Sequence, residues 1–147
     1  MSAPVYLDYN ATAPLKPAVI EAVAAALAET GNPSSVHGFR RLPRRTVEPA
    51  REAVAPPVNA APAFVVFTGS GTEAIILALH QARAGGSPIL VSAIEHDSVL
   101  RAAPEAARIP VSRDGLVDLG ALERLLTGTQ GALVAVMLAN NETGVIS

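Results

Sequence analysis

The chain of 147 residues has no cysteine and no tryptophan, and its aromatic residues are limited to three phenylalanines and two tyrosines. Without cysteine, these residues cannot form a disulfide, a thiolate metal site or a cysteine nucleophile. Half of the residues are hydrophobic, so the core has to be built from aliphatic side chains and alanine. The absence of cysteine also fits a cytoplasmic protein.

The chain also has no large excess of positive or negative charge. The formal net charge is −2, which gives no electrostatic reason to expect a nucleic acid or an acidic membrane surface as a partner. No apolar run approaches the roughly 18 residues that a membrane helix needs, and the N-terminus lacks the features of a secretory signal. We therefore expect no nucleic-acid partner, no membrane partner and no metal site. Lys16 is the only lysine.

The order of secondary structure predicts an α/β protein. Pro17 to Ala28 has helical spacing of its apolar residues, and a basic helical pattern over 39–55 contains Pro43 and Pro49, so that helix kinks, starts late or is weakened. From residue 63 onwards strands and helices alternate, which indicates a mainly parallel sheet with helices on both faces. We expect two parts, an N-terminal loop and helical segment (1–60) and the first part of an α/β domain (61–147). The predicted strands are 5–7, 63–68, 88–92, 109–111 and 132–138, and the later predicted helices are 72–84, 97–107 and 118–127, with Asp118 as a cap.

A glycine-rich turn follows the predicted strand at 63–68 and opens the helix at 72–84. Gly69 and Gly71 allow a ligand to approach the backbone, and Ser70 or Thr72 is suited to cap the helix. Such a turn points backbone N–H groups at an anion, most often a phosphate. Three interpretations remain open: an ordinary tight turn, a phosphate site for pyridoxal phosphate, or the dinucleotide fingerprint, in which Glu95 would bind a ribose.

Two more polar groups follow predicted strands, namely Glu95 with His96 and Asp97, and Asn140 to Thr143. Ligands of open α/β sheets bind beyond the carboxyl ends of the strands, so three polar groups at such ends favour one shared site. An imidazole offers a flat cofactor a face to stack on, and an asparagine amide both donates and accepts hydrogen bonds at a ring edge. His96 and Asn141 are therefore candidate contacts of an aromatic cofactor.

Five segments together resemble the N-terminal part of the cysteine desulfurases, which belong to the class V aminotransferase branch of the fold-type I pyridoxal-phosphate enzymes. They occur in the family's order and spacing and span nearly the whole chain. The fold implied is the large α/β domain of those enzymes, present here in part. The segments are YLDYNATAP at 6–14, GNPSSVH at 31–37, FTGSGTEA at 67–74, EH at 95–96 and NNETG at 140–144.

The resemblance implies roles for individual residues. Gly71 and Thr72 are similar to the residues that hold the phosphate of pyridoxal 5'-phosphate. His96 is similar to the catalytic histidine that stacks on the pyridine ring and helps to transfer protons, and Asn141 to the residue that contacts the ring's 3-oxygen. The residues Asn10, Ala11 and Thr12, and those of the loop 32–37, resemble segments on the substrate side of the active site.

The family reaction implied is the conversion of L-cysteine to L-alanine, with sulfur passed through a persulfide towards iron–sulfur clusters or thio-cofactors. The implied partners are L-cysteine, a second copy of the chain in a homodimer, and a sulfur-acceptor or scaffold protein. A selenocysteine lyase or another class V aminotransferase shares these motifs and stays an alternative, as do a dinucleotide-binding oxidoreductase domain and an inactive interaction module.

This sequence also departs from the family. The Schiff-base lysine and the persulfide cysteine are absent, since Lys16 precedes every cofactor motif and there is no cysteine. Ile75 and Ile76 replace residues that are usually polar, and Ser70 stands where glycine is usual. We therefore expect the isolated chain to be an inactive fragment.

Overall fold

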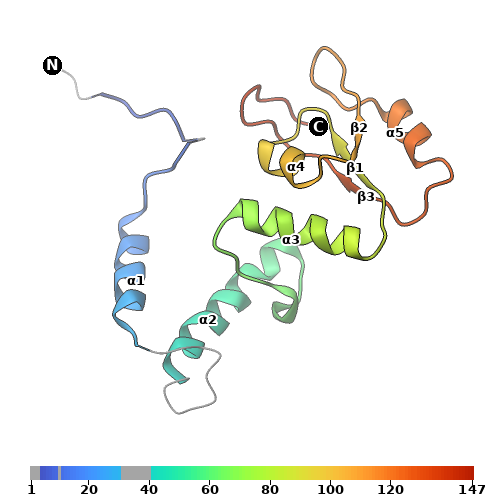
Figure 1. The fold of residues 1–147 in the computed structure, drawn as a ribbon. Coiled ribbons are helices and arrows are strands. Elements are labelled where there is room, and N and C mark those ends of the chain that lie inside the picture. The colour runs from blue at the N-terminus through green and yellow to red at the C-terminus, as the bar shows by residue number, and fades with distance from the viewer. Residues whose placement is uncertain (1–3, 10, 31–40) are drawn as a thin grey trace. The chain divides into compact units, whose positions relative to one another are not determined.

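The computed structural model describes residues 4–9, 11–30 and 41–147. The chain divides into two compact units, Met1–Phe67 and Thr68–Ser147, and Figure 1 labels their helices and strands. The predicted loop 32–37 and Asn10 lie outside the described residues. No helix in the described ranges is long and apolar enough to span a bilayer.

The regular elements described in the first unit are all helical. It contains α1 (Pro17–Ala28), α2 (Arg41–Val54) and two short 3-10 turns, η2 (Pro56–Val58) and η3 (Pro62–Phe64). The predicted helix at 17–28 is confirmed, with proline in its first turn, where a missing N–H costs nothing. Helix α2 begins ahead of Pro43 and runs through Pro49, so the two prolines do not divide it.

The predicted strands at 63–68 and 5–7 are wrong. Pro62 starts the 3-10 turn η3 instead, and the N–H groups of Phe64 and Val65 bond to the carbonyls of Ala61 and Pro62. The carbonyl of Val65 accepts a hydrogen bond from the Arg51 guanidinium. An apolar run becomes a strand only when its backbone groups pair with a neighbouring strand, and here the paired backbone groups of Phe64 and Val65 bond to the turn and to Arg51 instead. Residues 5–7 have no regular structure.

The second unit contains a three-stranded parallel sheet in the order β2-β1-β3. Leu90 in the central strand pairs with Ala107 on one side and Val134 on the other. Because the chain steps from β1 to one neighbour and then to the other, right-handed crossovers place α4 and α5 on opposite faces. The elements are α3 (Gly71–Ala84), β1 (Ile89–Ser92), α4 (Asp97–Ala102), β2 (Ala107–Ile109), α5 (Leu119–Leu126) and β3 (Leu133–Ala135).

The predicted elements of this unit are present, but several end early for identifiable reasons, and β2 lies two residues before the predicted 109–111. Helix α4 stops at Ala102 because Ala103 precedes a proline, which disfavours helical backbone angles, and it lies at φ −133° and ψ 68°. Strand β2 ends at Ile109 because Pro110 has no N–H for a ladder. Asp118 caps α5 as expected, its carboxylate accepting from the Ala121 N–H at 2.9 Å.

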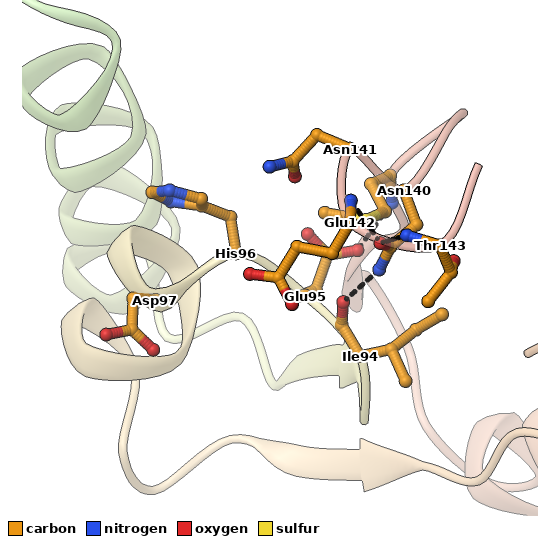
Figure 2. Close-up of a pocket in the computed structure, with 9 residues that line it drawn as sticks. Ile94, Glu95, His96, Asp97, Asn140, Asn141, Glu142 and Thr143 are labelled. Atoms are coloured by element: carbon orange, nitrogen blue, oxygen red, sulfur yellow. Dashed lines mark hydrogen bonds between the residues drawn. The ribbon is translucent and has the colours of Figure 1, made fainter. Parts of the chain in front are cut away.

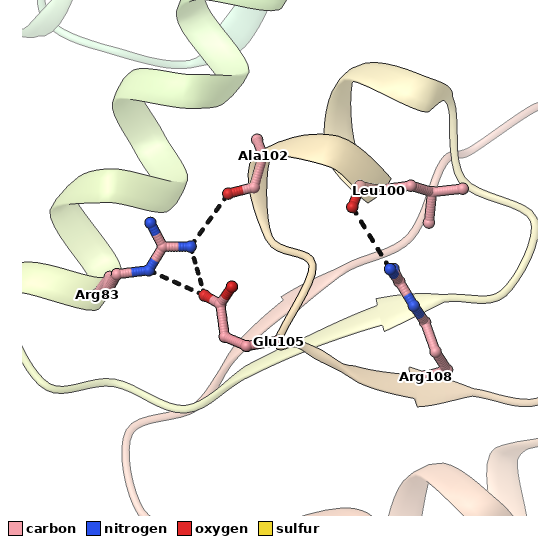
Figure 3. A network of polar contacts seen from close by, with 5 residues as sticks. All are labelled: Arg83, Leu100, Ala102, Glu105 and Arg108. Carbon is pink, nitrogen blue, oxygen red and sulfur yellow. Dashed lines mark hydrogen bonds and ion pairs between the residues drawn. The ribbon is translucent and has the colours of Figure 1, made fainter.

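The cluster that packs α3 and α4 against the sheet lies on one face, and Leu90 of β1 and Ala121 of α5 are buried as well, so the other face is also covered. Ile89 and Val91 of β1 pack against Leu79 of α3 and Val99 of α4. At one edge of this core, Arg83 of α3 bonds to the Glu105 carboxylate and to the Ala102 carbonyl (Figure 3). A backbone hydrogen bond at Glu105 and the Arg83 guanidinium lower the pKa of the Glu105 carboxyl. The pair is exposed, so the packed aliphatic side chains contribute most of the stability.

We expect Asp118→Ala to lower the free energy of unfolding by about 1 kcal/mol, because it removes the side-chain acceptor at the first turn of α5. Asp114→Ala is the matched control, since it deletes a carboxylate from an exposed loop nearby and should change stability by less than about 0.5 kcal/mol. Urea unfolding followed by circular dichroism measures both. Equal effects of the two substitutions would contradict the cap.

We also expect the isolated chain to self-associate. Among the described strands, β2 and β3 each pair on one side only, and apolar side chains of α3 lie at the surface, Ile76 being 49% and Leu77 52% exposed. Leu77→Glu should shift the chain towards monomer. Gln81→Glu adds the same charge to the same helix without removing apolar surface and should not. Light scattering coupled to size exclusion gives the mass, and a monomeric unmodified chain would contradict the expectation.

Candidate functional site

The glycine-rich turn is closed by two reciprocal hydrogen bonds. The Ser70 hydroxyl accepts from the Glu73 N–H at 3.1 Å, which makes Ser70 and not Thr72 the N-cap of α3. In return the Glu73 carboxylate accepts from the Gly69 N–H at 2.6 Å. This is close to a capping box, in which residues three apart satisfy each other's backbone donors. The turn is therefore held in shape by its own side chains.

Several backbone donors of this turn stay open. Within the described residues, no acceptor takes the N–H of Ser70, Gly71 or Thr72, and the last two begin α3. A side-chain carbon added at Gly71 would meet no heavy atom within 4 Å, so there is room beside these donors. Open N–H groups at a helix N-terminus suit an anion, and this part of the chain fits a phosphate.

His96 is the N-cap of α4. Its Nδ1 accepts from the Ser98 N–H at 3.1 Å and lies 2.7 Å from the Ser98 hydroxyl oxygen. A ring nitrogen that accepts from a backbone N–H carries no proton, so the neutral ring has its proton on Nε2. The cap therefore fixes both the tautomer and the place of the imidazole.

A pocket of about 440 Å³ opens beside His96 (Figure 2). One side comes from the connection between β1 and α4, and the other from the segment that follows β3. Both lie beyond the carboxyl ends of neighbouring parallel strands, where ligands of such sheets bind. The lining residues are Ile94, Glu95, His96, Asp97, Met137, Asn140, Asn141, Glu142 and Thr143.

The structure brings some of the predicted site residues together. His96 and Asn141 line this pocket from different segments. Gly71 and Thr72 are in the same unit but are not among its lining residues. Ala11 and Thr12 belong to the first unit, where the Tyr6 hydroxyl donates to the Thr12 carbonyl at 2.9 Å.

The sequence placed Glu95 and Asn140 after predicted strands but did not indicate that their side chains are buried and bond across this site. Glu95 is only 8% exposed and accepts from the Met137 N–H, and Asn140 is 9% exposed and donates to the Ile94 carbonyl at 3.2 Å. Polar residues placed directly after apolar strands were the available signal, and it was interpreted as ligand contact only. Among the described residues, no group of three or more histidine, aspartate or glutamate side chains could hold a metal ion.

The dinucleotide alternative loses its structural basis here. Its glycine turn should follow a strand, but residues 65–68 before this turn have no regular structure and follow the 3-10 turn η3. Its acidic residue should reach a ribose, and the carboxylate of Glu95 is buried against the backbone of Met137.

Comparison with known proteins agrees with the resemblance drawn from the motifs. The chain belongs to the aminotransferase class-V family, whose profile matches residues 5–147. It is 41% identical to an IscS-like cysteine desulfurase of Mycobacterium tuberculosis and 38% identical to a selenocysteine lyase of Bos taurus, with 96% and 97% of this chain aligned. The chain spans about 40% of the length of the first relative and 39% of the second.

Solved structures give the same result for the fold. The chain superposes on a NifS-like protein from Rickettsia africae with a TM-score of 0.86 at 34% identity, covering 97% of this chain and 41% of that one. It superposes on DndA from Streptomyces lividans with a TM-score of 0.69 at 33% identity, covering 97% of this chain and 43% of that one. The α/β fold with a parallel sheet, expected from the sequence as part of a fold-type I domain, is confirmed.

Proposed function

We propose that this chain forms the phosphate-and-ring-binding part of a pyridoxal-phosphate-dependent cysteine desulfurase. The observation that carries the proposal is the pair of open N–H groups at Gly71 and Thr72, in the same unit as a pocket lined by His96 and Asn141. The similarity to cysteine desulfurases over nearly the whole chain supports it.

The phosphate of the cofactor would take the N–H groups of Gly71 and Thr72 and the hydroxyl of Thr72. A dianion gains here from two donors and from the positive end of α3. Because Ser70 and Glu73 already satisfy the neighbouring donors, the turn needs no rearrangement before the anion binds.

The ring of the cofactor would lie between the two pocket walls. The His96 imidazole offers the face on which it stacks, and its proton on Nε2 gives the site one donor there. The Asn141 carboxamide would contact the 3-oxygen at the ring edge. When bound, pyridoxal phosphate supplies an electron-withdrawing ring that activates the amino acid substrate. The residues of this chain bind and orient that ring.

The substrate and partners follow from the same proposal. The whole protein would take L-cysteine, release L-alanine and pass sulfur through a persulfide to an acceptor or scaffold protein for iron–sulfur clusters or thio-cofactors. Asn10, Ala11 and Thr12 would lie on the substrate side of a site that a homodimer completes. A selenocysteine lyase is the second candidate, because one relative of comparable identity carries that name. A cytoplasmic location is part of the proposal.

We expect the isolated 147-residue chain to release no sulfide from L-cysteine above the rate of free pyridoxal phosphate. It has no thiol to accept sulfur, and its only lysine, Lys16, precedes the cofactor motifs. The measurement is sulfide production with excess cofactor. Turnover by the chain that His96→Ala abolishes would contradict the expectation.

We expect weak, non-covalent binding of pyridoxal phosphate, with a dissociation constant no tighter than about 0.1–1 mM. Thr72→Ala removes one hydroxyl contact and should cost about 1 kcal/mol, and Gly71→Val should cost more because it crowds the phosphate. Pyridoxine 5'-phosphate has no aldehyde to react with Lys16 or the terminal amine, so its titration reports non-covalent binding alone.

Thr127→Ala serves as the control, since it removes a hydroxyl from an exposed helix end and should leave the affinity unchanged. Affinity that is indifferent to both Gly71→Val and His96→Ala would place the ligand elsewhere. Competition by NAD, weakened by Glu95→Ala, would restore the dinucleotide alternative.

A further inference from the structure

The two pocket walls are joined beyond the end of the sheet. The ladder between β1 and β3 has its last pair at Val91 and Ala135. Past that point the backbones of the two segments are linked through side chains, with Glu95 accepting from the Met137 N–H and Asn140 donating to the Ile94 carbonyl at 3.2 Å. Each link crosses from one wall to the other, in opposite directions.

Both linking side chains are buried, so breaking either hydrogen bond would cost more free energy than breaking an exposed one. Glu95 is 8% exposed and Asn140 is 9% exposed. A buried polar group that loses its partner keeps its desolvation penalty, so such pairs hold their geometry more firmly than exposed ones. Two buried polar side chains therefore link the walls beyond the last residue pair of the β1–β3 ladder.

Asn140 makes further use of its polar groups. Its side-chain oxygen accepts from the N–H groups of Glu142 and Thr143 at 2.9 Å, its N–H donates to Val145 at 2.8 Å, and its carbonyl accepts from Gly144 at 2.8 Å. These bonds shape the turn that presents Asn141. The side-chain nitrogen is the one group of Asn140 that reaches the other wall (Figure 2).

We infer that Glu95 and Asn140 are positioning residues, which set the spacing between His96 on one wall and Asn141 on the other. Each is the direct chain neighbour of the residue that it places. The inference rests on the proposed function in that the object held between the walls is the pyridoxal ring. On this inference the two buried links determine how well a flat ring binds between the walls. The glycine turn binds the phosphate independently of them.

The test compares two ligands of the full 147-residue chain, pyridoxine 5'-phosphate and inorganic phosphate. Asn140→Asp keeps the oxygen that shapes the turn and removes the donor to Ile94. We expect it, like Glu95→Ala, to weaken pyridoxine 5'-phosphate about tenfold while the phosphate affinity stays within about twofold. Glu95→Gln keeps an acceptor for Met137 and should recover most of the affinity.

Glu123→Gln is the matched control, because it makes the same change at an exposed carboxylate of α5 that is not among the lining residues of the pocket. It should leave both affinities within about twofold of the unmodified chain. Equal losses for both ligands in Asn140→Asp and Glu95→Ala would indicate general loosening and overturn the inference. Unchanged pyridoxine 5'-phosphate affinity in both variants would overturn it as well.

Amide signals separate this inference from the proposed function. If the unmodified chain binds neither ligand, the proposed function fails, and the inference is judged on exchange and chemical shifts alone. Glu95→Ala should then expose the Met137 amide to solvent exchange and move the amide signals of His96 and Asn141, while that of Thr72 stays in place. Signals of His96 and Asn141 that do not move would overturn the positioning role.

Discussion

The second unit depends on the pairing of β1 with a strand on each side. Leu90, Val91 and Ser92 are almost completely buried, and their backbone groups bond to β2 on one side and β3 on the other. In a parallel sheet all strands end at the same edge, so this single strand brings the segments after β1 and β3 next to each other. The pocket follows from that adjacency, because neither segment could form it alone.

Much of this arrangement could be predicted from residue pattern. The apolar run at 88–92 and the helical spacing over 72–84 predicted β1 and α3 nearly to the residue, because burial on both faces and a capped start are local signals. Asp118 was predicted as a cap for the same reason. His96 and Asn141 were predicted as neighbours because polar residues after parallel strands converge at one edge.

The wrong predictions concern segments whose backbone hydrogen bonds depend on residues elsewhere in the chain. The segment 63–68 has strand composition, yet the 3-10 turn and Arg51 take its backbone groups. Strand β3 is shorter than predicted, and the N–H of Met137, just beyond it, bonds to the carboxylate of Glu95. No local sequence pattern predicts hydrogen bonds between residues more than forty positions apart. The buried roles of Glu95 and Asn140 could not be predicted for the same reason.

The cap on α4 has a consequence for the reach of His96. Nδ1 accepts from the Ser98 N–H, so this nitrogen faces its own helix, and Nε2 is the ring nitrogen left for other contacts. The same hydrogen bond supplies the side-chain acceptor at the first turn of α4. A contact that turned the ring away from Ser98 would therefore also uncap the helix, so the orientation of the imidazole and the start of α4 are tied to each other.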